Sequence, residues 1–276
     1  NNVLIMKTIL VPTDFHVAAE NAMAAAVKLA KNMDAKINLM TMFKFPKFKY
    51  QLVESVVHTE DEYYNMLKDD AAREIERWKE WYPDVEIEGN IKENFDELIP
   101  AILSEEADLI VMGSEGANGW KDYFQGTNSQ NVVRKADCPV MVMKENTAFE
   151  KIENVLFVTD FEKTGFIEKA MDLFNLKETK NKFVFIDTGE STDDRSDIYD
   201  TARDVEKLYD IQNFDFEIYR HDSVAKGTVE FADSHDIDLI IMFTHGRKGF
   251  ERFLFGSIAE EVVNISDIPV LSILEN

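Results

Sequence analysis

An internal repeat constrains this chain more than any other feature, because a duplicated segment must fold into the same unit twice. The segment Asp108–Met112 (DLIVM) returns as Asp238–Met242 (DLIIM), and the glycines after it return at the same offset of 130 residues. The opening Thr-Asp-Phe at 13–15 returns at 159–161, at an offset of 146 residues. The difference of 16 residues indicates an insertion in the first copy, which we place near residues 43–58.

The repeat predicts two domains, at residues 1–146 and 151–276, joined by a short linker. The whole chain has 276 residues, which suits two domains of ordinary size. Its 45% hydrophobic and 30% charged residues are typical of globular proteins and argue against disorder.

Short apolar runs alternate with helical stretches in both copies, a pattern typical of α/β proteins. Continuous apolar strands between helices predict a parallel sheet covered on both faces, in a doubly wound arrangement. In the first copy we expect strands at 7–12, 36–43, 85–91, 108–112 and 140–144, and helices at 18–33, 60–81, 96–105 and 126–136. In the second copy we expect strands at 155–159, 183–187, 214–219, 239–243 and 270–273.

The net charge limits the classes of partner that this chain can bind, and the single cysteine indicates its cellular compartment. Acidic residues number 53 against 30 basic ones, so a net charge of −23 disfavours nucleic acid and anionic membranes as partners. Cys138 is the only cysteine, which excludes an intrachain disulfide and suits a reducing cytoplasm. The apolar opening at 3–11 is too short to span a bilayer and lacks a cleavage site, so we expect a soluble cytoplasmic protein.

Glycine is concentrated in two windows. Seven of the 11 glycines fall in residues 113–126 and 243–256. The first window has Gly113 and Gly116, nine residues, and then Gly126-Thr127 before an expected helix. Free N–H groups at such a helix start suit a phosphate, but a glycine turn with a Thr cap explains the same residues equally well. Neither the Walker pattern nor Gly-x-Gly-x-x-Gly is present.

With Asp14 closing the first strand and Cys-Pro-Val at 138–140 opening the last, the glycine spacing resembles the universal stress protein family in its tandem form. The resemblance implies two adenine-nucleotide α-hydrolase-like domains, each with a five-stranded parallel sheet in the order 3-2-1-4-5. It also implies that the last strands of the two domains, at 140–144 and 270–273, pair antiparallel within one chain. Some members bind ATP, whereas others lack the motif and bind no nucleotide.

The resemblance also implies site residues, by position. Adenine would lie beside the end of the first strand and near the end of the second, and the phosphates on the glycine loop. For the first copy these residues are Pro12, Thr13, Asp14, Met42, Gly113, Gly116, Gly126, Thr127 and Ser129, and for the second Gly246, Gly256 and Ser257. A helix cap at Asp14 and a core position for Met42 are equally good interpretations of these two residues.

The second copy departs from the pattern, because Phe243 stands where Gly113 stands in the first. We expect its ring to fill space that the family gives to the nucleotide. The basic residues Arg247, Lys248 and Arg252 favour phosphate there, but flexible side chains can turn away whereas a filled cavity cannot hold a purine. The first copy is therefore predicted to hold the nucleotide.

Signals for catalysis are few. None of the five histidines forms a closely spaced ligand pair, and Gly-x-Ser-x-Gly is absent, so we expect neither a metal site nor a catalytic residue. Whether the chain is an enzyme stays open. The leading hypothesis is a stress-response sensor or regulator that binds ATP, with or without Mg²⁺, and does not turn it over rapidly.

Two alternatives remain. One is a nucleotide-free scaffold in which the inserted segment, with Phe45, Phe48 and Tyr50, binds a protein or a lipid-like ligand. The other is a slow ATP hydrolase, against which the missing catalytic base argues. A homodimer of the tandem chain and an unidentified protein partner also stay open.

Overall fold

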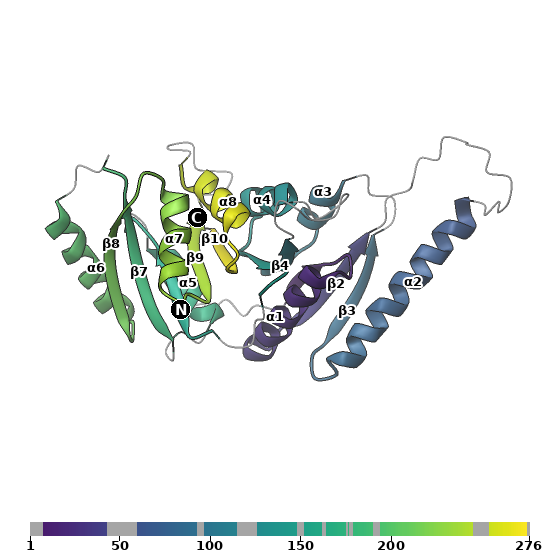
Figure 1. Cartoon of the computed structure of the whole chain (residues 1–276). Helices are drawn as coiled ribbons and strands as arrows, with labels where there is room; N and C mark the ends of the chain where they lie inside the picture. The colour runs from purple at the N-terminus through teal and green to yellow at the C-terminus, as the bar shows by residue number, and fades with distance from the viewer. Residues whose placement is uncertain are drawn as a thin grey trace.

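A computed structural model describes residues 8–42, 60–92, 97–114, 126–147, 152–161, 164–174, 176, 179–189, 194–244 and 254–274. Its strands form one ten-stranded sheet in the order β3-β2-β1-β4-β5-β10-β9-β6-β7-β8 (Figure 1). Each half of the sheet therefore has the order 3-2-1-4-5, counted from its own first strand. The prediction of two doubly wound five-stranded units is confirmed.

The first half contains β1–β5 and α1–α4. Its strands pair in parallel throughout, and α1 and α2 are its long helices. The bounds are β1 Thr8–Pro12, α1 Val17–Met33, β2 Lys36–Met42, α2 Glu60–Trp81, β3 Ile87–Lys92, α3 Leu98–Leu103, β4 Leu109–Ser114, α4 Gly126–Lys135 and β5 Val140–Lys144.

The second half repeats this order with β6–β10 and α5–α8, again with parallel pairing. The bounds are β6 Asn154–Val158, α5 Gly165–Leu173, β7 Lys180–Asp187, α6 Arg195–Tyr209, β8 Phe214–Arg220, α7 Val224–Ser234, β9 Leu239–Thr244, α8 Leu254–Ile265 and β10 Val270–Leu274. The predicted domain boundary falls between β5 and β6.

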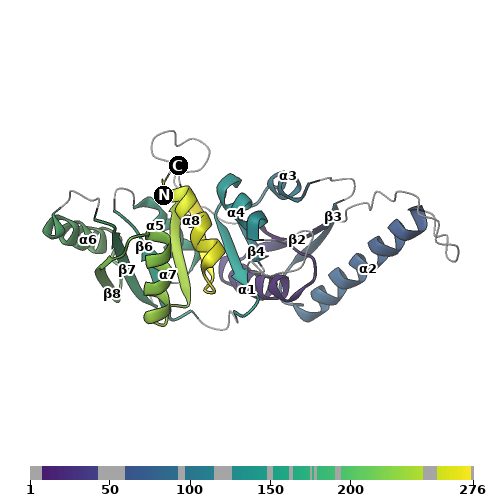
Figure 2. The ribbon, with the colours of Figure 1, turned by 45° about the horizontal axis from the view of Figure 1, so that its top comes forward.

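The sheet has a hydrophobic core on each face, as alternating strand side chains require. One core is built with residues of α1, α2, α5 and α6, and contains Trp78 and Phe157. The other is built with residues of α3, α4, α7 and α8, and contains Val132 and Phe231. Both cores run through both halves, so the sheet is the middle of three layers (Figure 2).

The two halves meet at β5 and β10, which pair antiparallel with Met141 opposite Leu271. The predicted pairing of the last strands is therefore confirmed. Beside this seam, α4 lies against α8 (Figure 2). The buried ammonium of Lys144 donates a hydrogen bond to the carbonyl of Val263 in α8, so the first half supplies a partner for the last turn of a helix in the second.

The insertion in the first copy is only partly visible. Residues 43–58, where we placed it, lie outside the described residues, but α2 has 22 residues against 15 in its counterpart α6. Part of the extra length therefore extends a helix, which lies along the edge strand β3 in Figure 1. None of the helices in the described ranges is long and apolar enough to cross a membrane.

Candidate functional site

The turn between β1 and α1 lies at the carboxyl ends of the first-half strands, where doubly wound sheets bind ligands. Thr13 is 2% exposed, its N–H bonds to the carbonyl of Met40 at 2.8 Å, and its Oγ1 accepts from the N–H of Phe15 at 2.9 Å. Phe15 has φ 62°, and its ring packs edge-on against Trp78 at 5.3 Å. A buried hydroxyl and an anchored aromatic ring therefore fix this turn.

Asp14 and Met42 border the same end of the sheet. The half-buried Asp14 accepts a hydrogen bond from the N–H of His16 at 3.1 Å, while His16 itself is the N-cap of α1. Asp14 thus forms a turn before the helix and does not cap it. Met42 ends β2, is half-buried and packs against the core, and its contact with adenine stays a prediction.

Gly113 lies in β4 under the first turn of α1. A Cβ atom at this position would lie 2.5 Å from the carbonyl carbon of Ala18 and 2.7 Å from the nitrogen of Ala19. Both are backbone atoms, so α1 can approach β4 this closely only over a glycine. Helix packing alone therefore accounts for Gly113.

Phe243 takes the place of Gly113 in the second half, and its ring lies in the core. It is 1% exposed and packs against Phe166 of α5, with 5.1 Å between the ring centroids. The ring thus fills space between β9 and α5 that α1 itself occupies in the first half. Our expectation that it fills nucleotide space at the strand ends is corrected, because its contacts lie beneath a helix.

Ser129 is a buried residue of α4, and its hydroxyl forms a hydrogen bond with another side chain of the protein. It is 1% exposed, and its hydroxyl donates to Oγ of Ser114 at the end of β4, over 3.1 Å. This bond joins the two ends of the glycine loop. The equivalent of Ser129 in the second half is Ala259, so the same bond cannot form there.

The helix starts at the ends of the two glycine loops differ. Gly126 is the first residue of α4, as predicted, whereas α8 begins at Leu254, two residues before Gly256. Ser257 is an exposed residue of that first turn. Gly116, Gly246 and the basic residues of the second loop lie outside the described residues, as does the side chain of Thr127.

The comparisons with known proteins agree with this architecture. The family model described as the universal stress protein family matches residues 6–144 and 186–273, which is most of the chain and both halves. The chain belongs to the universal stress protein family. The second match begins within β7, so β6 and α5, where Phe243 packs, lie outside it.

Individual relatives match this universal stress protein over one or both halves. A crystal structure of a universal stress protein from Archaeoglobus fulgidus has a TM-score of 0.71 at 19% identity, with 98% of each chain covered. Two universal stress proteins of Methanocaldococcus jannaschii are 29% and 25% identical over 51% and 50% of this chain, and 97% and 82% of their own lengths are covered. The first likeness covers nearly the whole chain and shows the tandem fold. Each of the other two covers about one half of this chain.

An ionic cluster that the sequence pattern does not indicate lies at the carboxyl ends of β7 and β8 in this universal stress protein. Asp187 accepts from the N–H of Gly189 at 2.8 Å and pairs with Arg220 at 2.9 Å and Arg195 at 3.3 Å. The Gly189 hydrogen bond, with help from both guanidinium groups, holds the pKa of Asp187 below its usual value. Arg220 is 33 residues from Asp187 in sequence, and the pairing of β7 with β8 places the two residues opposite each other. Arg195 follows Asp187 by eight residues and reaches it from the start of α6.

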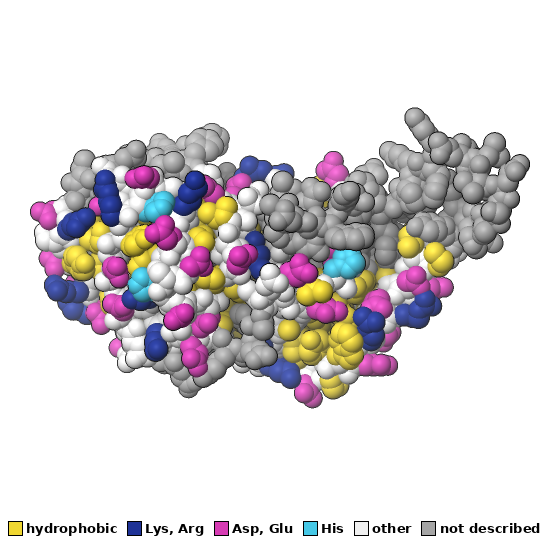
Figure 3. Space-filling view, in the orientation of Figure 1, with side chains coloured by type: hydrophobic (Ala, Val, Ile, Leu, Met, Phe, Trp, Pro, Cys, Tyr) yellow, Lys and Arg dark blue, Asp and Glu magenta, His cyan; other side chains and the backbone are white. Residues whose placement is uncertain are grey.

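The remaining surface charges are mixed. Lys and Arg side chains are scattered among Asp and Glu over the second half in Figure 3, although the chain as a whole is strongly acidic. Among the residues that the structure describes, no group of three or more His, Cys, Asp or Glu is placed to hold a metal ion.

Proposed function

We propose that this universal stress protein binds ATP, as the free nucleotide or with Mg²⁺, at the carboxyl ends of the first-half strands and acts as a cytoplasmic stress sensor or regulator. The observation that carries the proposal is the bond from Ser129 to Ser114. It holds the start of α4 against the end of β4, which is the neighbour of β1 in the sheet. We therefore expect the N–H groups at the start of α4 to face the same rim as the β1 turn with Thr13 and Asp14. The second half has Ala259 in place of Ser129.

The proposed site uses the rigid parts of the first half. Asp14 is half exposed beside the fixed turn of Thr13, where a carboxylate can accept from adenine or ribose donors. The positive end of α4 favours the phosphates, and Mg²⁺ would reduce repulsion between a triphosphate and an acidic chain. ATP serves as a bound signal, and a partner would read the occupied or empty state.

The experiment replaces the corresponding glycine in each half, so that each variant is the control for the other. Gly126→Asp puts a carboxylate at the start of α4, and Gly256→Asp does so in the first turn of α8. We expect calorimetry to show ATP binding to the unchanged protein and to Gly256→Asp, and none to Gly126→Asp. Loss only in Gly256→Asp would move the site to the second half.

The second candidate is a nucleotide-free scaffold. It is favoured by Gly113, since the close packing of α1 on β4 already accounts for that residue. Mass spectrometry of acid-extracted, freshly purified protein separates the candidates. Stoichiometric adenine nucleotide supports the ATP site. Its absence, together with no thermal shift in millimolar Mg-ATP, would leave the scaffold as the better explanation.

A further inference from the structure

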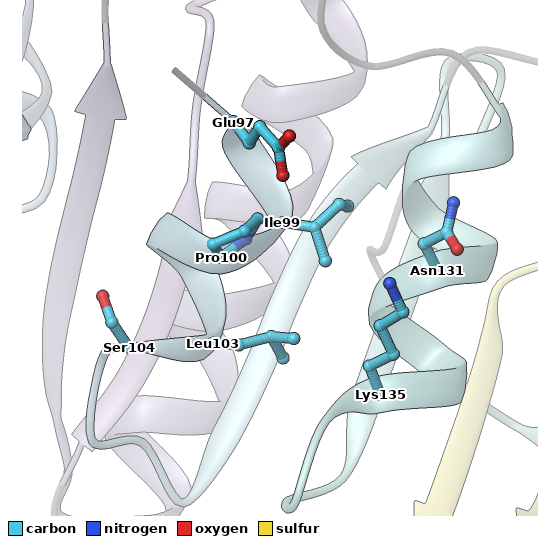
Figure 4. A pocket seen from close by; sticks show the side chains of 7 residues that line it. All are labelled: Glu97, Ile99, Pro100, Leu103, Ser104, Asn131 and Lys135. Atoms are coloured by element: carbon cyan, nitrogen blue, oxygen red, sulfur yellow. The ribbon is translucent and has the colours of Figure 1, made fainter. Parts of the chain in front are cut away.

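A hollow of about 420 Å³ lies between α3 and α4, in the helix layer of the first half. Ile99 and Leu103 point from α3 toward α4, and Asn131 and Lys135 reach in from the opposite side (Figure 4). Glu97, Pro100 and Ser104 complete the α3 side. None of these residues belongs to the proposed nucleotide site.

The short third helix leaves apolar surface in this hollow. Helix α3 has six residues, against 11 in its counterpart α7. Ile99 and Leu103 are four residues apart, so they share one face of α3, and both are only half buried against the core below. Two branched apolar side chains therefore line an open hollow.

The second half shows that this lining is not required by the fold. At the common offset of 130 residues, Pro100 corresponds to Glu230, Leu103 to Asp233 and Asn131 to Glu261. These acidic positions are all exposed in the second half. The first half thus lacks three acids that its own duplicate has, in a chain with a net charge of −23.

The charge of the hollow also differs. Lys135 corresponds to Ile265, and within the described residues Lys135 forms no ion pair. Figure 4 shows its ammonium between the α3 side chains and the amide of Asn131. Glu97 is the acidic residue in the lining and lies at the other end, at the start of α3. A single anionic group is favoured beside Lys135 and disfavoured near Glu97.

We propose that this hollow binds a small amphipathic monocarboxylate, such as a medium-chain aliphatic acid. Its carboxylate pairs with the ammonium of Lys135, and its apolar body lies along Ile99 and Leu103. The volume is within the range of small-molecule sites, which are mostly apolar with a few polar groups that fix orientation. Glu97 selects against dicarboxylates and nucleotides, so the ligand class differs from that of the proposed ATP site.

Methyl NMR on the full chain, labelled at Ile and Leu, tests the proposal. Octanoate is expected to give saturable shifts at the methyl groups of Ile99 and Leu103. Octanol, which has a similar body and no charge, should bind about tenfold more weakly, and octylammonium should give no saturable shift. Equal affinities for octanoate and octanol would overturn the role of Lys135, and an absence of saturable shifts with octanoate would overturn the site.

The second half supplies the variants. Lys135→Ile should remove the preference for octanoate over octanol, and Leu103→Asp should abolish binding of both. Lys135 is exposed, so we expect Lys135→Ile to fold. It therefore tests the proposal even if Leu103→Asp does not fold. Ile265→Lys in α8 is the matched control, because Glu261 lies one turn before it on the same helix and Asp233 stands in the position of Leu103. Octanoate binding in the second half of that control would contradict the requirement for an apolar lining.

Discussion

Replacing Gly113 by Ala tests whether α1 is held in backbone contact with β4. The new Cβ would lie 2.5 Å from the carbonyl carbon of Ala18 and 2.6 Å from its oxygen. Ordinary contact between carbon atoms requires about 3.5 Å, so the two elements must separate by roughly 1 Å. Overpacking of this kind costs about 1–3 kcal/mol, and here a whole helix must move because no side chain can give way.

The proposed assay is urea unfolding followed by tryptophan emission. All three tryptophans, Trp78, Trp81 and Trp120, lie in the first copy, so the signal reports the half that contains Gly113. The unfolding free energy of Gly113→Ala is expected to fall by about 1–3 kcal/mol. A change below roughly 0.5 kcal/mol would refute the close contact.

A second pair of variants separates backbone contact from side-chain contact. A Cβ at Gly89 would lie 2.5 Å from Cγ2 of Ile75, which is a side-chain atom. Ile75→Leu removes that branch, so we expect it to offset part of the cost of Gly89→Ala. Ala18→Gly should offset none of the cost of Gly113→Ala, because it leaves the contacting backbone in place. Recovery in that double variant would show that a side chain, and not the helix backbone, limits the approach.

Three further predictions concern buried groups. Phe243→Ala should cost about 3–5 kcal/mol in unfolding followed by circular dichroism, because it leaves a cavity beside Phe166, and a loss below about 1 kcal/mol would contradict this packing. Burial raises the pKa of Cys138 to about 12, so the folded protein at pH 8 should react with a thiol reagent about a thousandfold more slowly than the protein unfolded in urea. Because the folded state holds this proton more tightly, the protonated Cys138 thiol also stabilises the fold below pH 9. That contribution is lost as the pH rises toward 12. Burial lowers the pKa of Lys144, so the unfolded chain holds this proton to higher pH than the folded chain does. Lys144 therefore makes the unfolding free energy rise with pH up to about 10.5. Lys144→Leu should remove that rise, and an unchanged pH profile would show that the ammonium is not desolvated.

Local pattern was enough to predict most elements of this fold. Helix α2 has the expected bounds at 60 and 81, because its apolar residues recur at helical spacing over six turns. The strand order and the antiparallel pairing of β5 with β10 came from the family resemblance, and periodicity alone does not supply them. Helix α3 was expected over 96–105 and spans Leu98–Leu103, since Glu97 and Ser104 are its flanking caps.

The features that could not be predicted from the sequence depend on tertiary contacts between residues far apart in the chain. Gly113 was predicted to make room for a ligand, and the structure adds the backbone of α1 as its neighbour. Ser129 was predicted to hold phosphate, and the structure gives its hydroxyl a partner in Ser114. The pairing of Asp187 with Arg220 depends on the alignment of β7 with β8, which no local spacing encodes. The role of Gly116 in ligand binding stays a prediction.

The antiparallel seam has a consequence for any communication between the halves. Because every strand of one half runs opposite to every strand of the other, the rims at the carboxyl ends of their strands face away from each other across the sheet. No single small molecule can bridge both rims, and two occupants cannot touch. A signal between them would have to pass through the joint itself, as a shift of α4 against α8 or a change at the contact of Lys144 with Val263.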